Sequence, residues 1–280
     1  MTNRAHDPQT RRLGIALGAL ALSVAGAAAQ TAPAMPNGAD AVQGYLPKGA
    51  LPDSAALLPP PPAEGSAALA LDQAISQADL ALRDGPRWTL AAMDANLGFP
   101  WAAGDFACAL GAGVTPEDTP RLYRLLRRTL ADAGAAAGPA KNRYNRRRPF
   151  LENKQPTCSP ADEESLAKNG SYPSGHTTIG WTWALALSEI APERGDAILA
   201  RGRAFGDSRL VCNVHWESDV IEGRNLAAGV VARLHDDATF LADLNAAKDE
   251  LAAARAKGLA PQRDCQQEAD ALASVPIQGP

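Results

Sequence analysis

Apolar residues recur at helical spacing through most of this chain, and this periodicity limits the possible folds more than any other sequence feature. Three stripes beyond Ser66 each fit one face of a helix: Leu71, Ile75 and Leu82; Leu122, Leu125, Leu126 and Leu130; and Phe240, Leu244 and Leu251. Spacings of three and four residues are typical of helices that bury one face. We find no convincing run with the two-residue alternation of a strand. The pattern therefore predicts an all-α fold, built as a single-domain helical bundle.

Composition separates a globular domain from a segment on either side of it. A chain of 280 residues with 46% hydrophobic content can bury a core of its own, and one domain is the simplest interpretation. We assign this helical domain to residues 66–256. Residues 30–65 are rich in proline, glycine and alanine and include the run Leu58–Pro62, which predicts an extended lead segment. Residues 257–280 form a C-terminal tail that a disulfide at Cys265 would tether.

The N-terminus has the features of a secretory signal. Three arginines precede the apolar run Leu13–Ala25, and three alanines stand directly before Gln30. The apolar run is shorter than the roughly 20 residues that a membrane-spanning helix needs, which disfavours the alternative of an uncleaved anchor. We therefore expect residues 1–29 to be a cleaved signal peptide. The mature protein would be periplasmic or secreted and would have no membrane partner.

Charge and cysteine content narrow the possible partners and the redox compartment. The formal charge of −4 becomes more negative when a signal with three arginines and one aspartate is removed, so bulk attraction to nucleic acid is not expected. The four cysteines have no Cys-x-x-Cys spacing, which argues against a zinc site. An even number of cysteines in an exported protein predicts disulfides, and spacing alone leaves three connectivities open. The candidates are Cys108, Cys158, Cys212 and Cys265.

The first of three motifs that carry chemistry is Lys141 with Arg148, within a run that holds five positive charges. Taken alone, such a run is more typical of a solvated basic face. An arginine fork and a compact lysine charge can, however, surround a phosphate from different sides. We predict that Lys141 and Arg148 bind phosphate, and we interpret Arg143, Arg146 and Arg147 as exposed or structural ion-pair residues.

The second motif, Pro173-Ser174-Gly175-His176, precedes a segment with helical spacing that extends to Ile190. It therefore lies at a helix N-terminus, where free N–H groups and the positive end of the helix dipole favour an anion. Ser174 alone would be interpreted as an N-cap and Gly175 as a turn residue. We predict in addition that they present a hydroxyl and an N–H group to phosphate.

The third motif joins Ser208-Arg209 to His215 and Asp219. A preceding helix is expected to end at Gly206, because glycine commonly stops helices. The four-residue separation of His215 and Asp219 places both side chains on the same face if the turn is helical. Arg209 would add a third cation to the phosphate site.

Together these groups predict phosphoryl transfer through a covalent intermediate. His215 is the predicted nucleophile, because Asp219 can accept a hydrogen bond from one ring nitrogen and aim the other. His176 is the predicted general acid, which would protonate the leaving oxygen and then activate water. The remaining groups would stabilise the equatorial phosphoryl oxygens without a metal or other cofactor. These are Lys141, Arg148, Ser174, Gly175 and Arg209.

The spaced triple Lys141-x6-Arg148-Pro149, Pro173-Ser174-Gly175-His176 and Ser208-Arg209-x5-His215-x3-Asp219 resembles the signature of the type 2 phosphatidic acid phosphatase superfamily. Within it, the chain is most similar to the secreted bacterial class A nonspecific acid phosphatases, over residues 58–253. The resemblance implies the all-helical fold shared with vanadium haloperoxidases, a phosphohistidine intermediate and no required metal. It also implies homo-oligomers and broad action on small phosphate monoesters such as nucleotides, sugar phosphates and aryl phosphates, with possible phosphotransfer.

Two finer expectations come from the same resemblance. It implies that Cys158 pairs with Cys212, which leaves Cys108 for Cys265. Relatives often carry an acidic residue before Asp-Ala-Gly where this chain has Ala131. The leaving-group preference or the pH optimum is therefore expected to differ.

Three other functions fit parts of the pattern. Vanadate imitates a phosphoryl transition state, so a vanadium-dependent haloperoxidase could use the same cage, although the chain is short for such an enzyme. An integral-membrane lipid phosphatase would need spanning helices, which the sequence lacks. A noncatalytic periplasmic phosphate-binding protein would not need both His176 and His215 together with Asp219.

Overall fold

The computed structural model describes residues 1–2 and 42–274, and no strand occurs among them, which confirms the all-α prediction. The α-helices are α1 (Ser54–Leu57), α2 (Ala67–Asp79), α3 (Pro86–Asp94), α4 (Ala107–Leu110), α5 (Pro120–Ala136), α6 (Gly138–Tyr144), α7 (Pro149–Asn153), α8 (Glu163–Ala167), α9 (Gly175–Ile190), α10 (Gly195–Val211), α11 (Glu217–Leu234), α12 (Ala238–Ala256) and α13 (Cys265–Ala273). Short 3-10 turns are η1 (Lys48–Ala50), η2 (Leu80–Leu82), η3 (Trp101–Gly104), η4 (Pro160–Asp162) and η5 (Pro192–Arg194). Beyond its first two residues, the predicted signal peptide lies outside the described residues.

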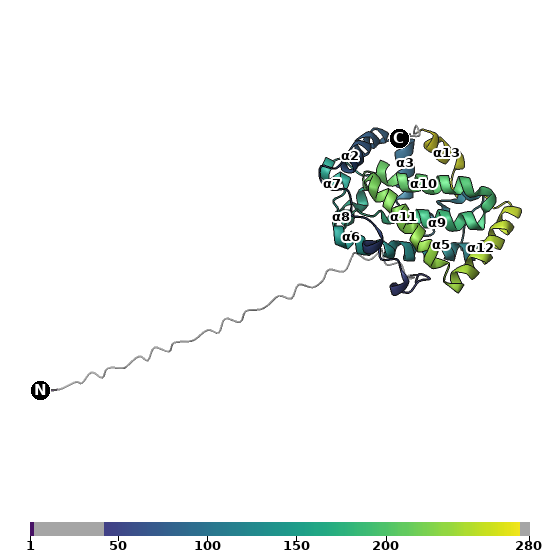
Figure 1. The fold of residues 1–280 in the computed structure, drawn as a ribbon, viewed down its shortest axis with the longest axis horizontal. Helices are drawn as coiled ribbons and strands as arrows, with labels where there is room; N and C mark the ends of the chain where they lie inside the picture. The colour runs from purple at the N-terminus through teal and green to yellow at the C-terminus, as the bar shows by residue number, and fades with distance from the viewer. Residues whose placement is uncertain (3–41, 275–280) are drawn as a thin grey trace. The chain divides into compact units, whose positions relative to one another are not determined.

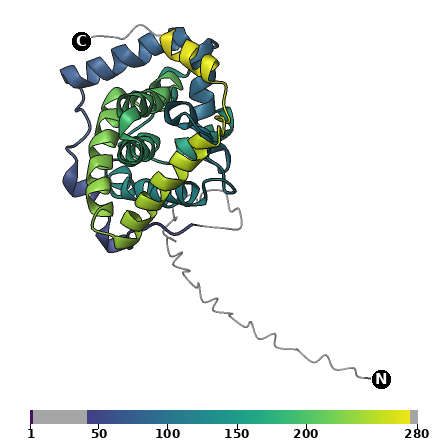
Figure 2. The same ribbon diagram turned by 90° about the vertical axis from the view of Figure 1, so that its right-hand side faces the viewer.

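Helix α9 is the central element of residues 42–274, and it packs against α5, α10, α11 and α12. Helices α9 and α10 run side by side across Figure 1 and are seen end-on in Figure 2, with the other helices around them. The indole of Trp183 in α9 is fully buried and stacks edge-on against Phe106. Its ring N–H donates to the carbonyl of Leu126 at 3.0 Å, so this large core side chain leaves no polar atom unsatisfied.

Glycines let α9, α10 and α11 approach closely. A Cβ atom at Gly180 in α9 would meet the ring of Phe205 in α10 at 2.2 Å, and one at Gly206 would meet Thr177 at 3.0 Å. The prediction that a helix ends at Gly206 is wrong, because α10 continues through it to Val211. Gly206 serves helix packing instead of stopping the helix.

Two of the three predicted apolar stripes face the core, and of the third only Leu82, beyond the end of α2, packs against a core cluster. Leu122, Leu125 and Leu126 in α5 are buried, as are Phe240, Leu244 and Leu251 in α12. In α2, by contrast, Leu71 is 58% exposed whereas Asp72 is only 2% exposed. The assignment of an inward apolar face to α2 is therefore wrong. This helix turns an acidic face inward, where Asp72 forms a buried ion pair with Arg146.

Both disulfides lie within the described residues. The structure pairs Cys158 with Cys212 and Cys108 with Cys265, which is the pairing that the family resemblance implies. The second bond ties helix α13, in the predicted tail, to α4 near the start of the bundle. Among residues 42–274, no helix combines the length and the apolar character needed to cross a bilayer.

Asp79 at the end of α2 makes stability depend on pH. Burial, and then repulsion from Asp207 and Glu217, raises its pKa from 3.8 to about 7, against the attraction of Arg87. A raised pKa means that this carboxyl favours the folded state below pH 4 and loses that contribution as the pH rises through about 7. At 1.36 kcal/mol per pKa unit, the destabilisation at pH 8 is at most about 4 kcal/mol.

Asp79→Asn is therefore expected to raise the urea midpoint of unfolding at pH 8 and to leave it nearly unchanged at pH 4. Asp84→Asn is the matched control, because the side chain of Asp84 is 83% exposed. An equal gain at both pH values would show that the ionisation of Asp79 is not the cause.

Candidate active site

The second motif caps the central helix as predicted. Ser174 precedes α9, and its Oγ accepts a hydrogen bond from the Thr177 N–H at 3.2 Å. The next N–H groups, at Gly175 and His176, open the first turn, where a helix offers no internal acceptor. The Ser174 N–H itself donates to the carbonyl of Asp219 at 2.9 Å, so the second and third motifs are in direct contact.

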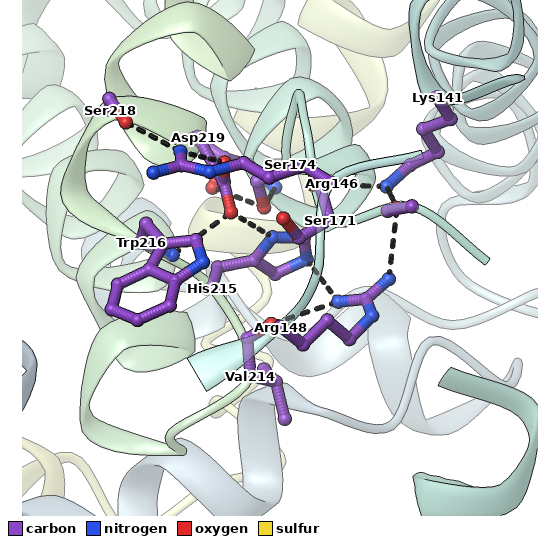
Figure 3. Close-up of polar contacts among 12 residues, drawn as sticks. Lys141, Arg146, Arg148, Ser171, Ser174, Val214, His215, Trp216, Ser218 and Asp219 are labelled. Carbon is purple, nitrogen blue, oxygen red and sulfur yellow. Dashed lines mark hydrogen bonds and ion pairs between the residues drawn. The ribbon is translucent and has the colours of Figure 1, made fainter. Parts of the chain in front are cut away.

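His215 lies just before α11 and is held on two sides. Its Nδ1 is 3.2 Å from Oδ2 of Asp219 (Figure 3), and that oxygen also accepts from the Trp216 N–H at 2.9 Å. The backbone N–H groups of Val214 and His215 both point to the carbonyl of Arg209, at 3.2 and 3.3 Å. The predicted His215–Asp219 pair is therefore present, and both side chains are buried.

Arg148 fixes the tautomer of His215. Its Nη1 is 3.0 Å from Nε2 of His215, on the side of the ring opposite the Asp219 contact. A guanidinium can only donate, so Nε2 must be the accepting nitrogen. Nδ1 then carries the proton and donates it to Asp219, and the lone pair of Nε2 is directed into the site.

Lys141 and Arg148 are held in place by carbonyl groups. The ammonium of Lys141 donates to the carbonyls of Gly170 and Ser171, at 2.7 and 3.2 Å, and Figure 3 shows the side chain of Lys141 directed toward this segment. Arg148 has several acceptors, namely the carbonyls of Leu166 and Val214 and the side-chain oxygen of Asn169. These cations therefore occupy fixed positions before any ligand arrives.

Arg209 differs from these two cations. Its side chain is 1% exposed, and its Nε and Nη1 have no hydrogen-bond partner among the described residues. Leaving charged donors buried and unsatisfied is costly, and such exceptions call for an explanation. An oxyanion that enters the site would supply the missing acceptors.

His176 stands in the first turn of α9 and is half-buried. Its Nε2 lies 3.0 Å from the carbonyl of Ala95, which can only accept, so Nε2 carries a proton and Nδ1 remains for proton transfer. Burial, and then the charge of Arg209, lowers the pKa of His176 well below 6.5, while the bond to Ala95 acts in the opposite direction. In the absence of a ligand, His176 is therefore neutral near pH 6.5.

Electrostatics keep His215 neutral and the arginines charged. Burial, and then the neighbouring cations led by Arg148, lowers the pKa of His215 well below 6.5. Burial likewise lowers the pKa of Lys141 well below its usual range, and it lowers the pKa of Arg148 and of Arg209 to about 10. At mildly acidic pH the site thus combines a neutral imidazole with fixed positive charge, which suits a phosphate dianion.

Arg146 contacts Asp219, the carboxylate beside His215. Its Nη1 donates to Oδ1 of Asp219 at 2.7 Å (Figure 3), and its Nη2 donates to Asp72 at the same distance. It is thus a structural ion-pair residue, one of the two interpretations that the sequence left open, whereas Arg143 and Arg147 are exposed. No sequence signal separates Arg146 from Arg147.

Asp94 is a second residue that the sequence analysis did not place in the site. This buried carboxylate accepts hydrogen bonds from Ser208 Oγ at 2.6 Å and from Arg201 at 2.5 Å. Asp94 directly precedes Ala95, which binds His176, and Ser208 directly precedes Arg209. One carboxylate therefore anchors the segments that hold His176, the predicted acid, and Arg209, which is predicted to bind phosphate.

Within residues 42–274, no group of three or more His, Cys, Asp or Glu side chains is arranged to hold a metal ion. The structure brings together all eight predicted catalytic and phosphate-binding residues around one end of α9. The contacts and electrostatic interactions described above join Lys141, Arg148, Ser174, Gly175, His176, Arg209, His215 and Asp219.

Comparison with known proteins agrees with this geometry. The model of the PAP2 superfamily matches residues 125–239, which include all three motifs. The acid phosphatase of Zymomonas mobilis subsp. mobilis is 44% identical over 73% of this chain and 77% of its own length. The non-specific acid phosphatase of Providencia stuartii is 46% identical over 74% of this chain and 84% of its own length, and that of Salmonella typhimurium is 42% identical over 69% and 78%.

These relatives match most of the chain, and residues 125–239, which the family model matches, include all eight predicted site residues. The chain therefore belongs to the PAP2 superfamily and, within it, to the family of the bacterial non-specific acid phosphatases.

Proposed function

We propose that this protein is a metal-independent acid phosphatase that hydrolyses small phosphate monoesters through a phosphohistidine at His215. The observation that carries the proposal is the placement of the His215 ring between Asp219 and Arg148. This arrangement leaves a neutral imidazole with its Nε2 lone pair directed toward the cations. The similarity to the acid phosphatases of Zymomonas mobilis and Providencia stuartii supports the same activity.

In the first step, the Nε2 lone pair of His215 attacks phosphorus while the bond from phosphorus to the ester oxygen breaks. Protonated His176 gives its Nδ1 proton to the leaving oxygen, which departs as an alcohol. Arg209 and the N–H groups at the start of α9 hold the equatorial oxygens. Arg148 moves its hydrogen bond from Nε2 to a phosphoryl oxygen, which frees the lone pair for attack.

In the second step, water attacks the phosphorus of the phosphohistidine. His176, now neutral, takes a proton from that water, and the electron pair of the P–N bond returns to Nε2 of His215. Inorganic phosphate leaves, and both histidines regain their starting protonation states. Asp219 stays ionised throughout and stabilises the positive charge that develops on the His215 ring.

The lowered pKa values of His215 and His176 are consistent with catalysis at acidic pH. His215 must be neutral to attack, and because its pKa lies well below 6.5, it stays neutral in mild acid. His176 must be protonated to donate, and a bound phosphate dianion raises its pKa by stabilising the charged ring. Activity should therefore be highest on the acidic side of neutrality and should decline as the pH rises above it.

Location, substrates and assembly form part of the proposal. The arginines, apolar run and alanines before Gln30 support export and cleavage, and two disulfides suit an oxidising compartment. We therefore place the mature enzyme in the periplasm or outside the cell. The substrates would include nucleotides, sugar phosphates and aryl phosphates, and the family resemblance supports a homo-oligomer.

Purified mature protein tests this function with 4-nitrophenyl phosphate and a panel of nucleotides, with and without a chelator and vanadate. We expect hydrolysis that a chelator leaves unchanged and that vanadate inhibits, because vanadate imitates the phosphoryl transition state. Loss of activity in chelator would contradict metal independence. Peroxidase activity that requires vanadate, in a protein without phosphatase activity, would instead identify a haloperoxidase.

The role of His176 can be tested through the leaving group. In His176→Ala, we expect kcat/KM for an alkyl phosphate, which reports the first step, to fall by about 10²–10⁴-fold, the usual contribution of a general acid. The kcat/KM for 4-nitrophenyl phosphate should fall far less, because nitrophenolate leaves without protonation. Equal losses on both esters would mean that His176 does not donate the proton.

A further inference from the structure

A continuous chain of ionic hydrogen bonds leads from helix α2 to the nucleophile. Asp72 accepts from Nη2 of Arg146 at 2.7 Å, and Nη1 of Arg146 donates to Oδ1 of Asp219, also at 2.7 Å. The other oxygen of Asp219 faces Nδ1 of His215 at 3.2 Å. Asp72, Asp219 and His215 are each no more than 3% exposed, so water screens these charges weakly.

Ser218 fixes the outer end of this chain. Its N–H donates to Oδ1 of Asp72 at 2.8 Å, and its Oγ donates to Oδ2 at 2.6 Å. Arg146 also donates to Ser218 Oγ at 2.7 Å, and Figure 3 shows Arg146, Ser218 and Asp219 converging at the start of α11. The position of Arg146 is therefore determined by both carboxylates and by the hydroxyl of Ser218, in the helix that carries Asp219.

We propose that Arg146 and Asp72 are positioning residues that set the lowest pH at which the His215–Asp219 pair can act as a nucleophile. This inference rests on the proposed function and goes beyond it, because neither residue touches substrate. Arg146 keeps Asp219 ionised and turned toward His215. Asp72 holds Arg146 in place and partly offsets its charge.

The charges around Asp219 show why Arg146 matters most. Burial raises the pKa of Asp219 above 3.8, and the charge of Arg146 is the largest opposing influence, ahead of the Trp216 N–H and of Lys141. His215 also faces Asp219, Asp72 binds the other terminal nitrogen of Arg146, and Arg148 and Tyr172 interact with Asp219 over a longer range. Without Arg146, Asp219 would take up a proton at a higher pH and could no longer hold the positive charge on His215.

Two substitutions should move the acid limb of the pH profile in opposite directions. Arg146→Gln removes a positive charge in direct contact with Asp219, so the acid midpoint of kcat/KM should rise by about 1–3 pH units. Asp72→Asn removes a negative charge that is separated from Asp219 by the side chain of Arg146, so the same midpoint should fall by a smaller amount, about half a unit. The midpoint belongs to the coupled His215–Asp219 pair and not to either residue alone.

The opposite signs separate electrostatic positioning from a merely structural role. Damage to packing alone would lower activity in both variants without moving the acid midpoint, or would move the midpoint of both variants in the same direction. Either result would overturn the proposal. Arg146→Lys keeps the positive charge, so its acid midpoint of kcat/KM should stay close to that of the unsubstituted enzyme. This should hold even if the separate contacts of Nη1 with Asp219 and of Nη2 with Asp72 are lost. It also serves as the test if Arg146→Gln fails to fold.

Arg147→Gln is the matched control, because Arg147 is the exposed sequence neighbour and its side chain contacts only the carbonyl of Leu151 among the bonds described here. We expect its pH profile to coincide with that of the unsubstituted enzyme. All profiles are measured with 4-nitrophenyl phosphate, and circular dichroism confirms folding. If the unsubstituted enzyme hydrolyses this ester and the Arg146 and Asp72 variants do not shift, this inference fails while the proposed function stands.

Discussion

His215→Ala is expected to lower kcat by about 10⁴-fold or more, since loss of a covalent nucleophile removes the reaction path itself. Binding of phosphate should persist, because Arg209 and the N-terminus of α9 are unchanged. Steady-state hydrolysis of 4-nitrophenyl phosphate measures the loss, and vanadate or phosphate inhibition measures the remaining binding.

The control for this substitution is His235→Ala. His235 is a partly exposed histidine at the end of α11 that pairs with Glu189 and has no contact with the motif residues. We expect full activity from this variant. If His215→Ala kept more than a few per cent of the activity in a folded protein, another group would be the nucleophile.

Arg209→Met is expected to lower kcat by about 10²–10³-fold, the usual effect of removing one oxyanion donor. The same substitution should not destabilise the folded protein. The Nε and Nη1 atoms of Arg209 are buried without a hydrogen-bond partner among the described residues, so the folded enzyme carries unsatisfied charged donors that a methionine would remove. The melting temperature should therefore stay the same or rise while catalysis is lost.

Arg203→Met tests whether this trade-off is specific. Arg203 lies in the same helix, α10, and its side chain is 71% exposed beside Asp207. Its removal should change neither kcat nor the melting temperature appreciably. A large loss of stability in Arg209→Met would mean that its donors are satisfied within the folded protein, and a mild effect on kcat would place the arginine outside the reacting centre.

The sequence predicted those features that depend on local pattern. The apolar faces of α5 and α12 follow from residues such as Leu122, Leu126 and Phe240, whose partners are also apolar, so periodicity alone identifies them. The cap at Ser174 and the pairing of His215 with Asp219 are set over three and four residues of chain. Local spacing therefore sufficed for the fold class and for the contact between His215 and Asp219.

The features that the sequence did not reveal depend on contacts between distant segments. Helix α2 buries Asp72 and exposes Leu71, because the positive charge of Arg146 pairs with the buried carboxylate. Arg146 lies 74 residues further along the chain, so no local pattern reveals this pair. Arg146 and Arg147 are chemically identical neighbours, and only the folded chain separates the residue that holds Asp219 from the exposed one. A hydrophobic pattern carries no information about which buried carboxylate will find a cation.

Gly206 illustrates the same limit for backbone signals. Glycine often stops a helix, but here it allows α10 to approach Thr177 in α9 and Val220 in α11. Which of these roles applies depends on the neighbouring helices, and these are not encoded within a short window of sequence.

Rapid-quench mass spectrometry of the enzyme during turnover tests the covalent intermediate most directly. The reaction with a dinitrophenyl phosphate is stopped within milliseconds at alkaline pH, where a phosphorylated imidazole survives, and the digested protein is searched for an added phosphoryl group. We predict that the group is found on the peptide that contains His215, at Nε2, and that it disappears when substrate is exhausted. A phosphoryl group on a different side chain, or none at all while phosphate is still being released, would contradict the mechanism.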